Sequence, residues 1–271
     1  MTAAAGSASP ARPGSVDLNA DLAEGFGRWT FGTDDDLLSV VTSANVACGF
    51  HAGDPTVIRT AVATAAARAV TIGAHVGYPD LQGFGRRAMD VSHGELVDLA
   101  VFQIATLTGL ARVEGTEVRY VKPHGALYNR VVIDEAQAAA VAEAVESVDP
   151  GLAVMSLHGS ALQQAAQARG LRVIDEVFAD RAYLSSGQLA PRSMPGTVIH
   201  DPGVVVERVL RMVLAGEVVA VDGSVIGVSV DSICVHGDSP GAVDLARRTS
   251  TALRDAGVVL RSPLAPAVTE E

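Results

Sequence analysis

The 271-residue chain has almost no lysine and few positive charges. Lys122 is its one lysine beside nineteen arginines, and 31 Asp and Glu residues outweigh these 20 cations to give a formal net charge of −11. Nucleic acids and anionic membrane surfaces both attract proteins through basic faces. The shortage of positive charge therefore argues against nucleic acid or a membrane surface as a partner.

The chain also lacks the features of exported and membrane proteins. Its two cysteines, Cys48 and Cys234, are too few for a disulfide framework, so we expect buried thiols in a reducing compartment. No apolar run reaches the roughly 18–20 residues of a bilayer span. The N-terminal segment has neither the basic nor the apolar region of a secretory signal. These absences predict a soluble, cytoplasmic protein.

What the chain does contain is the composition of a packed globular protein. Hydrophobic residues make up 48% of it and charged residues 19%. Residues 1–15 are rich in Ala, Gly, Ser and Pro and are expected to form a disordered tail. No internal repeat or linker follows, so residues 16–271 are predicted to form a single domain.

Short apolar runs alternate with longer helical patterns along this domain. Strands are expected at residues 16–19, 40–47, 70–74, 118–121, 152–157, 172–177 and 225–235. Helices are expected at residues 56–69, from the capping box at Ser92 onward, and at 134–147, 160–169, 202–215 and 240–256. This alternation is typical of a parallel sheet with crossover helices. Polar residues follow nearly every strand and no glycine-rich phosphate turn follows the first, which favours an irregular seven-stranded (β/α) barrel.

Besides His158, which lacks an acidic neighbour, four of the seven histidines follow predicted strands. They are His51, His75, His124 and His236. In a parallel barrel these strand ends meet at one mouth, so the four imidazoles are expected to converge there. Each has a glycine close by, which would let the backbone approach a ligand. The other three histidines, His93, His158 and His200, are expected to be structural or solvated.

Carboxylates occupy several of the same strand ends. Asp21 and Glu24 follow the first strand, and Asp238 follows the seventh. Glu176 ends an apolar strand, where a bare buried carboxylate would be costly. It must therefore be either functional or paired, and Arg181 is a candidate partner.

Lys122 gives the sharpest single inference. A chain that uses arginine nineteen times retains lysine at one strand end, which indicates a demand for a compact ammonium with a tunable pKa. Such a lysine could polarise a carbonyl, hold a phosphate or act as an acid. Nearby, Arg86 and Arg87 lie in a glycine-bearing loop that could receive a carboxylate or phosphate. The sequence has no P-loop, nucleophile elbow or H-E-x-x-H helix, which excludes the serine-hydrolase and zincin classes.

Five long segments of the chain resemble the LamB/YcsF family. They are VDLNAD (16–21), SANVACGFHAGDP (43–55), VKPHGALYN (121–129), EVFADRAY (176–183) and SICVHGDSP (232–240). The resemblance runs from about Val16 to Leu253. It implies a β/α barrel similar to the glycoside hydrolase/deacetylase group. It also implies ATP-dependent opening of the 5-oxoproline lactam to L-glutamate, together with two partner subunits, B and C. The family usually has Gly in place of Ala23 and commonly Pro in place of Val76.

The resemblance also implies roles for the mouth residues. Lys122 would stabilise the developing oxyanion, and the four mouth histidines would supply the general base and acid. The carboxylates expected to orient these imidazoles are Asp21, Glu176 and Asp238. The residues expected to bind the substrate are Asn19, Glu24, Asn45, Arg86 and Arg181, with one of the two arginines holding its carboxylate.

Two other functions remain open from the sequence. One is a metal-dependent deacylase, because Asp21, His51 and His75 have the Asp-His-His composition of related barrel hydrolases. The other is a non-catalytic subunit that shapes or stabilises a complex. The sequence identifies ATP only as a co-substrate of the complex, and leaves both the subunit that binds it and the presence of a divalent metal undetermined.

Overall fold

The computed structural model describes residues 14–30, 34–236 and 241–265. Asp238, one of the predicted catalytic residues, lies outside them. Of the predicted N-terminal tail, residues 1–13 also lie outside, whereas Ser15 already belongs to the first strand.

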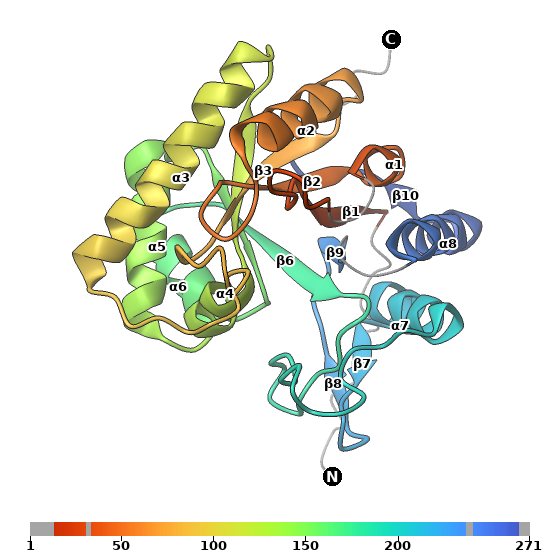
Figure 1. The fold of residues 1–271 in the computed structure, drawn as a ribbon. Coiled ribbons are helices and arrows are strands. Elements are labelled where there is room, and N and C mark those ends of the chain that lie inside the picture. Colours follow the sequence, from red (N-terminus) through yellow and green to blue (C-terminus); the bar gives the residue numbers. More distant parts are fainter. Residues whose placement is uncertain (1–13, 31–33, 237–240, 266–271) are drawn as a thin grey trace.

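Seven parallel strands form a closed barrel (Figure 1). In barrel order they are β1 (Ser15–Leu22), β2 (Ser43–Ala47), β3 (Thr71–Val76), β4 (Val118–Pro123), β5 (Ala153–Ser156), β6 (Val173–Phe178) and β9 (Ser232–Val235). The barrel closes where β9 pairs in parallel with both β6 and β1. A two-residue strand, β10 (Val259–Leu260), adds to the other edge of β1. The predicted seven-stranded β/α barrel is confirmed.

Helices pack around the outside of the barrel. The longer ones are α2 (Pro55–Ala67), α3 (His93–Val113), α5 (Glu135–Val148), α6 (Ala161–Ala168), α7 (Pro202–Ala215) and α8 (Ala242–Asp255). The predicted caps are confirmed, since the side chains of Asp54, Ser92 and Asp134 each accept a backbone N–H of the first turn. Two short helices, α1 (Asp34–Leu38) and α4 (Gly125–Val131), were not predicted.

The prediction of one strand over residues 225–235 is wrong in its extent. Only Ser232–Val235 enters the barrel, as β9. The earlier part, β8 (Val225–Gly227), turns back on β7 (Glu217–Val219) as an antiparallel hairpin beside α7. Gly223 permits this turn with a φ of 84°. The sequence did not indicate the interruption between β8 and β9, because both segments are rich in β-branched residues that favour strands.

The inside of the barrel combines buried polar groups with a small apolar cluster, and the main apolar core lies between the barrel and its helices. Along β1, alternate residues Val16, Leu18, Ala20 and Leu22 belong to the main core. The residues between them, together with their counterparts on other strands, are buried polar groups: Asp17, Asn19, Asp21, Ser43, Asn45, His75, Lys122, Glu176 and Ser232. The strands therefore bring charged groups into contact inside the molecule.

Helix α3 bears on the expectation that no apolar segment is long enough to span a bilayer. Its 21 residues include an 18-residue window with a mean hydropathy of 1.5, enough by length and composition to cross a membrane, and a third of that window is buried. Its buried residues, from Leu96 to Ala111, recur with helical spacing on one face. The helix packs with that face against α5, β3 and β4. Its apolar composition thus has a structural reason in the barrel's outer layer. The cytoplasmic location stays a prediction.

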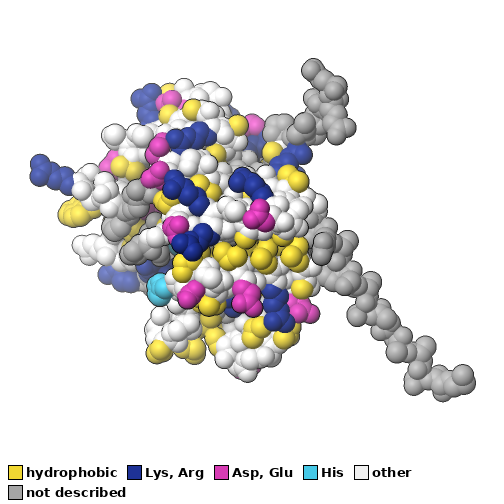
Figure 2. Space-filling view, turned by 90° about the vertical axis from the view of Figure 1, so that its right-hand side faces the viewer, with side chains coloured by type: hydrophobic (Ala, Val, Ile, Leu, Met, Phe, Trp, Pro, Cys, Tyr) yellow, Lys and Arg dark blue, Asp and Glu magenta, His cyan; other side chains and the backbone are white. Residues whose placement is uncertain are grey.

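Charges of both signs share the surface formed by α8 and its neighbours. Figure 2 shows basic and acidic side chains interspersed on this face. Arg248 pairs with Asp244 one helical turn away, and Arg247 lies 3.5 Å from Asp36 of α1. Positive charge on this face is therefore offset locally.

Gly73 allows β3 to pass against a ring inside the barrel. A Cβ at Gly73 would lie 2.1 Å from the Tyr120 ring, which is buried and donates to Asn45 through its hydroxyl. We predict that Gly73→Ala lowers the free energy of unfolding by about 1–3 kcal/mol, because the strand backbone and the ring cannot both keep their places. Urea denaturation measures the change.

The matched control is Gly109→Ala. Gly109 lies on α3 with open space at its Cβ position, so the same substitution should raise stability by up to about 1 kcal/mol. Equal effects of the two substitutions would contradict the packing described for the barrel interior.

Candidate active site at the barrel mouth

A cavity of about 310 Å³ opens at the carboxyl ends of the strands. Eight predicted site residues line it: Asp21, Glu24, His75, Arg86, Lys122, His124, Arg181 and His236. Four others, Asn19, Asn45, His51 and Glu176, are fully buried but do not line it. The convergence of polar strand ends on one mouth is therefore a feature of the structure. The catalytic or binding role of each residue stays a prediction.

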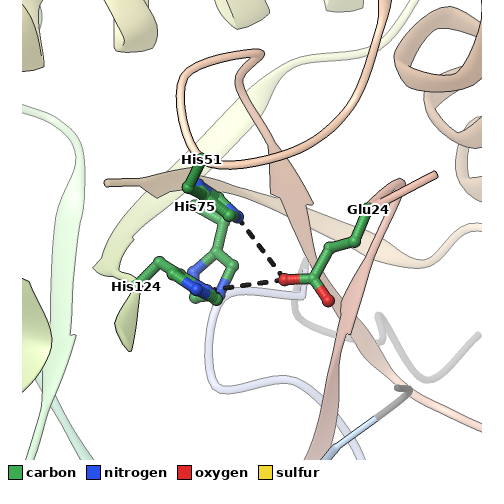
Figure 3. Close-up of side chains that lie close together, drawn as sticks. All are labelled: Glu24, His51, His75 and His124. Carbon is green, nitrogen blue, oxygen red and sulfur yellow. Dashed lines mark hydrogen bonds and ion pairs between the residues drawn. The ribbon is translucent and has the colours of Figure 1, made fainter. Parts of the chain in front are cut away.

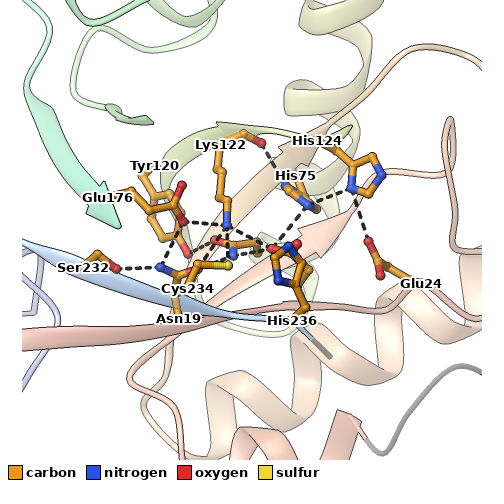
Figure 4. A network of polar contacts seen from close by, with 12 residues as sticks. Asn19, Glu24, His75, Tyr120, Lys122, His124, Glu176, Ser232, Cys234 and His236 are labelled. Carbon is orange, nitrogen blue, oxygen red and sulfur yellow. Dashed lines mark hydrogen bonds and ion pairs between the residues drawn. The ribbon is translucent and has the colours of Figure 1, made fainter. Parts of the chain in front are cut away.

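Lys122 is the centre of the charged network inside the mouth (Figure 4). Its Nζ lies 2.6 Å from Glu176 Oε1, 3.1 Å from Asp21 Oδ1 and 3.1 Å from Cys234 Sγ. It also donates to Asn19 Oδ1 at 3.2 Å. An ammonium has three N–H groups, and here four acceptors lie within reach of them. The oxyanion contact predicted for Lys122 would require one of these acceptors to be released.

The pairing of Glu176 with Lys122 corrects two expectations. Glu176 was expected to pair with Arg181 or to orient an imidazole. Its partner is the ammonium, because both side chains point inward from strands of the barrel. Arg181 instead lies beyond the end of β6 and donates to the carbonyl of Ala190 at 2.7 Å.

The charges of this network stabilise one another. Burial alone would lower the pKa of Lys122, but Asp21, Cys234 and Glu176 raise it well above its usual value. Burial would raise the pKa of Asp21, yet His75 and Lys122 hold it well below its usual value. Burial raises the pKa of the Cys234 thiol. The site therefore contains a permanent ammonium and an ionised Asp21.

Two buried asparagines donate hydrogen bonds to the carboxylates of this network. Asn45 donates to Asn19 Oδ1 at 2.7 Å and to Asp21 Oδ1 at 2.8 Å. Asn19 in turn donates to Glu176 and to Ser232. These amides donate to one oxygen of each buried carboxylate, which lowers the cost of burial, while Glu176 Oε2 has no hydrogen-bond partner among the described residues. The two residues thus hold the charged groups of the site in place.

Three histidines and Glu24 form a second cluster beside Lys122 (Figure 3). His51 and His124 stack with their ring centroids 3.8 Å apart. Glu24 Oε1 lies 3.4 Å from His51 Nε2 and 3.4 Å from His124 Nδ1. His124 Nδ1 also lies 3.0 Å from His75 Nε2. These four side chains, which we call the histidine cluster, come from the loops and strand ends of β1 to β4.

Glycines next to the histidine cluster have a different use from the one expected. A Cβ at Gly77 would lie 2.8 Å from His51 Nδ1. One at Gly85, where φ is +63°, would lie 2.7 Å from His51 Cβ and 2.8 Å from His124 Cδ2. The missing side chains let the backbone close over the imidazoles themselves.

The fourth mouth histidine, His236, lies apart from the cluster. Its Nδ1 is 2.7 Å from Asp180 Oδ1, and its Nε2 is 2.9 Å from a guanidinium nitrogen of Arg192. Since arginine can only donate, Nε2 carries the lone pair and Nδ1–H donates to Asp180. Asp180 thus orients His236, the role that was expected of Asp238.

Three arginines line the same cavity: Arg86, Arg181 and Arg192. Arg181 is 4% exposed, and its Nε has no hydrogen-bond partner among the described residues. Burial, then the neighbouring charge of Arg192, lowers the pKa of Arg181 to about 10. The other arginine of the predicted loop, Arg87, instead pairs with Asp80. Convergent guanidinium groups with an unused buried donor are suited to an anionic ligand.

Two groups of described residues could hold a metal ion. One is the histidine cluster, whose ligand atoms all lie within 4.8 Å of one another. The other is Asp21, Cys234 and His236. Lys122 Nζ already lies 3.1 Å from both Asp21 and Cys234, so an ammonium supplies the positive charge there. The acid that accompanies His51, His75 and His124 is thus Glu24, whereas the sequence pointed to Asp21.

Tyr128 and Arg192 are among the cavity-lining residues that sequence reasoning missed. Tyr128 lies one helical turn after His124 on α4, and burial with the adjacent Glu176 raises its pKa well above the usual value. Recognition of α4 would have identified it by this spacing. Arg192 lies in the long loop after β6, where no periodic pattern marks it. Both cysteines are buried free thiols, as predicted.

The sequence can be compared with known families and proteins. The LamB/YcsF family matches residues 16–268. The A subunit of 5-oxoprolinase from Mycobacterium avium is 56% identical over 247 residues, which cover 91% of this chain and 98% of the relative. A 5-oxoprolinase A subunit from Pseudomonas syringae pv. tomato, numbered 3 in that organism, is 53% identical over 247 residues, covering 91% and 96%.

Solved structures give the same relationship. The lactam utilization protein from Thermus thermophilus superimposes with a TM-score of 0.87 at 47% identity, covering 92% of this chain and 99% of that one. A putative cellobiose-phosphate cleavage protein from Enterococcus faecalis has a TM-score of 0.56 at 11% identity, covering 92% and 97%. This second structure is similar in fold alone.

The buried network predicts a large stability effect for one substitution. Lys122→Met would leave Asp21 and Glu176 buried without their counter-charge, so we expect it to lower the free energy of unfolding by about 3–5 kcal/mol. The double variant Lys122→Met/Glu176→Gln should be less destabilised than the sum of the single variants, because it removes one of the stranded carboxylates.

The exposed pair of Arg59 and Glu114 provides the control. Arg59→Met should cost less than about 1 kcal/mol, since its guanidinium is 60% exposed. Urea denaturation of the four variants measures the differences. Strict additivity of the Lys122 and Glu176 substitutions would contradict their electrostatic coupling.

Proposed function

The chain belongs to the LamB/YcsF family, and we propose on this basis that it is the A subunit of a 5-oxoprolinase. Its reaction is the hydrolytic opening of the lactam of 5-oxo-L-proline to L-glutamate, coupled to cleavage of ATP to ADP and phosphate. It acts with partner subunits B and C. The names of relatives that are more than 50% identical over nine-tenths of the chain support this proposal.

The observation that carries the proposal from the structure is the arginine-lined cavity. The substrate has a carboxylate at one end and a resonance-stabilised amide at the other. Arg181, with its unused buried donor, and Arg192 suit the carboxylate. His75, His124 and His236 line the same small cavity and suit the amide. A volume of about 310 Å³ is at the lower end for small-molecule sites, which suits a ligand of this size.

His236 is the best general base among the cavity residues. Its neutral form has a lone pair at Nε2, and Asp180 accepts from Nδ1–H and so fixes this tautomer. In this arrangement His236 removes a proton from water as the water attacks the lactam carbon. Asp180 then stabilises the imidazolium that forms. Arg192, which donates to Nε2 in this structure, moves aside to the substrate carboxylate in the same step.

ATP addresses the poor electrophilicity of the lactam. Transfer of its terminal phosphoryl group to the amide oxygen would activate the ring carbon for attack by water. The tetrahedral adduct would collapse with protonation of the ring nitrogen and cleavage of the C–N bond, and hydrolysis of the resulting acyl phosphate by a second water would release L-glutamate and phosphate. Lys122, held between Asp21 and Glu176, contributes a fixed positive charge near this oxygen. The chain has no P-loop sequence, so we assign ATP to the complex rather than to this chain alone.

The direct test is a 5-oxoproline-dependent ATPase assay, with glutamate measured in parallel. We expect no turnover by this chain alone and stoichiometric ADP and glutamate once both partners are added. ATP-independent hydrolysis of an N-acetyl compound by the chain alone, lost on chelation, would instead support the deacylase alternative. Full activity of mouth variants in an assembled complex would support a non-catalytic subunit.

Arg181 supplies the specific prediction for substrate binding. Arg181→Gln should raise the KM for 5-oxoproline by about 10–100-fold, because a charge-assisted hydrogen bond to the carboxylate is lost. Weak turnover of 2-pyrrolidinone, which is the same lactam without the carboxylate, should change little. The exposed Arg211, which pairs with Glu217, gives the matched control Arg211→Gln. Equal losses for both lactams would show that Arg181 does not read the carboxylate.

A further inference from the structure

The histidine cluster holds an arrangement of lone pairs that needs a cation. His75 Nδ1 lies 3.0 Å from the carbonyl oxygen of Lys122, and His124 Nε2 lies 2.9 Å from that of Phe84. Carbonyl oxygens can only accept, so these two nitrogens carry the ring protons. The other nitrogen of each neutral ring, His75 Nε2 and His124 Nδ1, therefore presents a lone pair. These two atoms face each other at 3.0 Å.

Two carboxylates and a buried imidazole lie beside this gap. Glu24 Oε1 lies 3.4 Å from His124 Nδ1, and Asp21 Oδ1 lies 3.4 Å from His75 Nε2. His51 is 0% exposed, and neither of its ring nitrogens has a hydrogen-bond partner among the described residues. Its Nε2 also lies 3.4 Å from Glu24 Oε1. Four donor atoms thus lie within 4.8 Å of one another, and a rotation of the stacked His51 or His124 ring would direct all four at one ion.

Three of the six distances between these atoms are close to those of a tetrahedral metal site. With metal–ligand distances of 2.0–2.1 Å, tetrahedral ligands lie about 3.3 Å apart. The three distances that join Glu24, His51, His124 and His75 in sequence are 3.4, 3.4 and 3.0 Å. The two backbone carbonyls that fix the tautomers of His75 and His124 are the usual outer partners of ligating histidines. Three imidazoles and one carboxylate suit zinc and exclude magnesium, which requires oxygen ligands.

We propose that Glu24 Oε1, His51 Nε2, His75 Nε2 and His124 Nδ1 bind one divalent transition-metal ion of the zinc class. Three of these residues line the cavity, so the ion lies in its wall. Under the proposed function, on which this role alone rests, the ion would polarise the lactam carbonyl by taking its oxygen as a fifth ligand. Metal binding itself depends only on the cluster.

The competing occupant of the gap is a proton shared by His75 and His124. The two occupants are distinguishable, since a shared proton requires no metal and gives no ligand-field spectrum.

The test is a titration of the full-length, chelator-stripped chain with Co²⁺, followed visibly, and then with Zn²⁺ as competitor. We expect about one equivalent to bind with the intense visible bands of tetrahedral Co²⁺, and Zn²⁺ to displace it. Mg²⁺ should not compete. Zn²⁺ should also raise the Tm by about 5 °C or more when it is in hundredfold excess over its Kd. Failure of the wild-type chain to bind Co²⁺ or Zn²⁺ stoichiometrically would overturn the proposal without any variant.

Two substitutions locate the ion. His51→Gln should weaken Co²⁺ binding by more than about 100-fold. Loss of a residue that only supports a metal ligand costs up to about 100-fold, and loss of a ligand itself should cost more. His158→Gln should leave it unchanged, because His158 is 66% exposed and pairs with Asp175 outside the cluster. Unchanged affinity in folded His51→Gln would overturn the assignment. These binding measurements use no ATP, partner subunit or 5-oxoproline. The metal site can therefore be disproved while the proposed 5-oxoprolinase activity is retained, and the activity can be disproved while the metal site is retained.

Discussion

The ion pair of Lys122 with Asp21 and Glu176 is the interaction on which the mouth of the barrel depends. It lies inside a closed ring of strands, where an unpaired charge would be costly, and it is completed by the amides of Asn19 and Asn45. Most small barrels fill this space with apolar side chains. Here β1, β2, β4, β6 and β9 contribute polar residues to the interior, beside a small apolar cluster that includes Tyr120, Met155 and Ile174.

The chemistry of the mouth is divided between two neighbouring groups. On one side, Asp180, His236 and Arg192 form a directed chain of hydrogen bonds. On the other, Glu24 and three imidazoles converge beside Asp21. Lys122 lies between them, and its backbone carbonyl accepts from His75 while its ammonium holds Asp21. Replacement of the lysine would leave Asp21 without its ammonium, and Asp21 lies 3.4 Å from His75 Nε2, so the change would reach the histidine cluster through this carboxylate.

The sequence predicted the barrel because its signals are local and repeated. Caps at Asp54, Ser92 and Asp134 and the spacing of strands and helices do not depend on distant residues. The convergence of histidines followed from the topology, since parallel strands place their ends together. The hydrogen-bond and ion-pair partners of the site residues could not be predicted in this way, because they depend on the face of the strand that each residue occupies. Glu176 was thus expected near Arg181, although its strand turns it toward Lys122. Ala23 shows the same limit: its φ of 60° explains why glycine is favoured there in the family, but only the structure reveals that angle.

The central claim is that one anionic lactam binds between the arginines and the histidine cluster at this mouth. A crystal structure of the chain soaked with 5-oxoproline, with anomalous data at the zinc edge, tests it most directly. The account predicts the ligand carboxylate within hydrogen-bond distance of Arg181 and the ring carbonyl directed at an anomalous peak among Glu24, His51, His75 and His124. A ligand bound outside the cavity, or with its carboxylate turned away from the arginines, would contradict it.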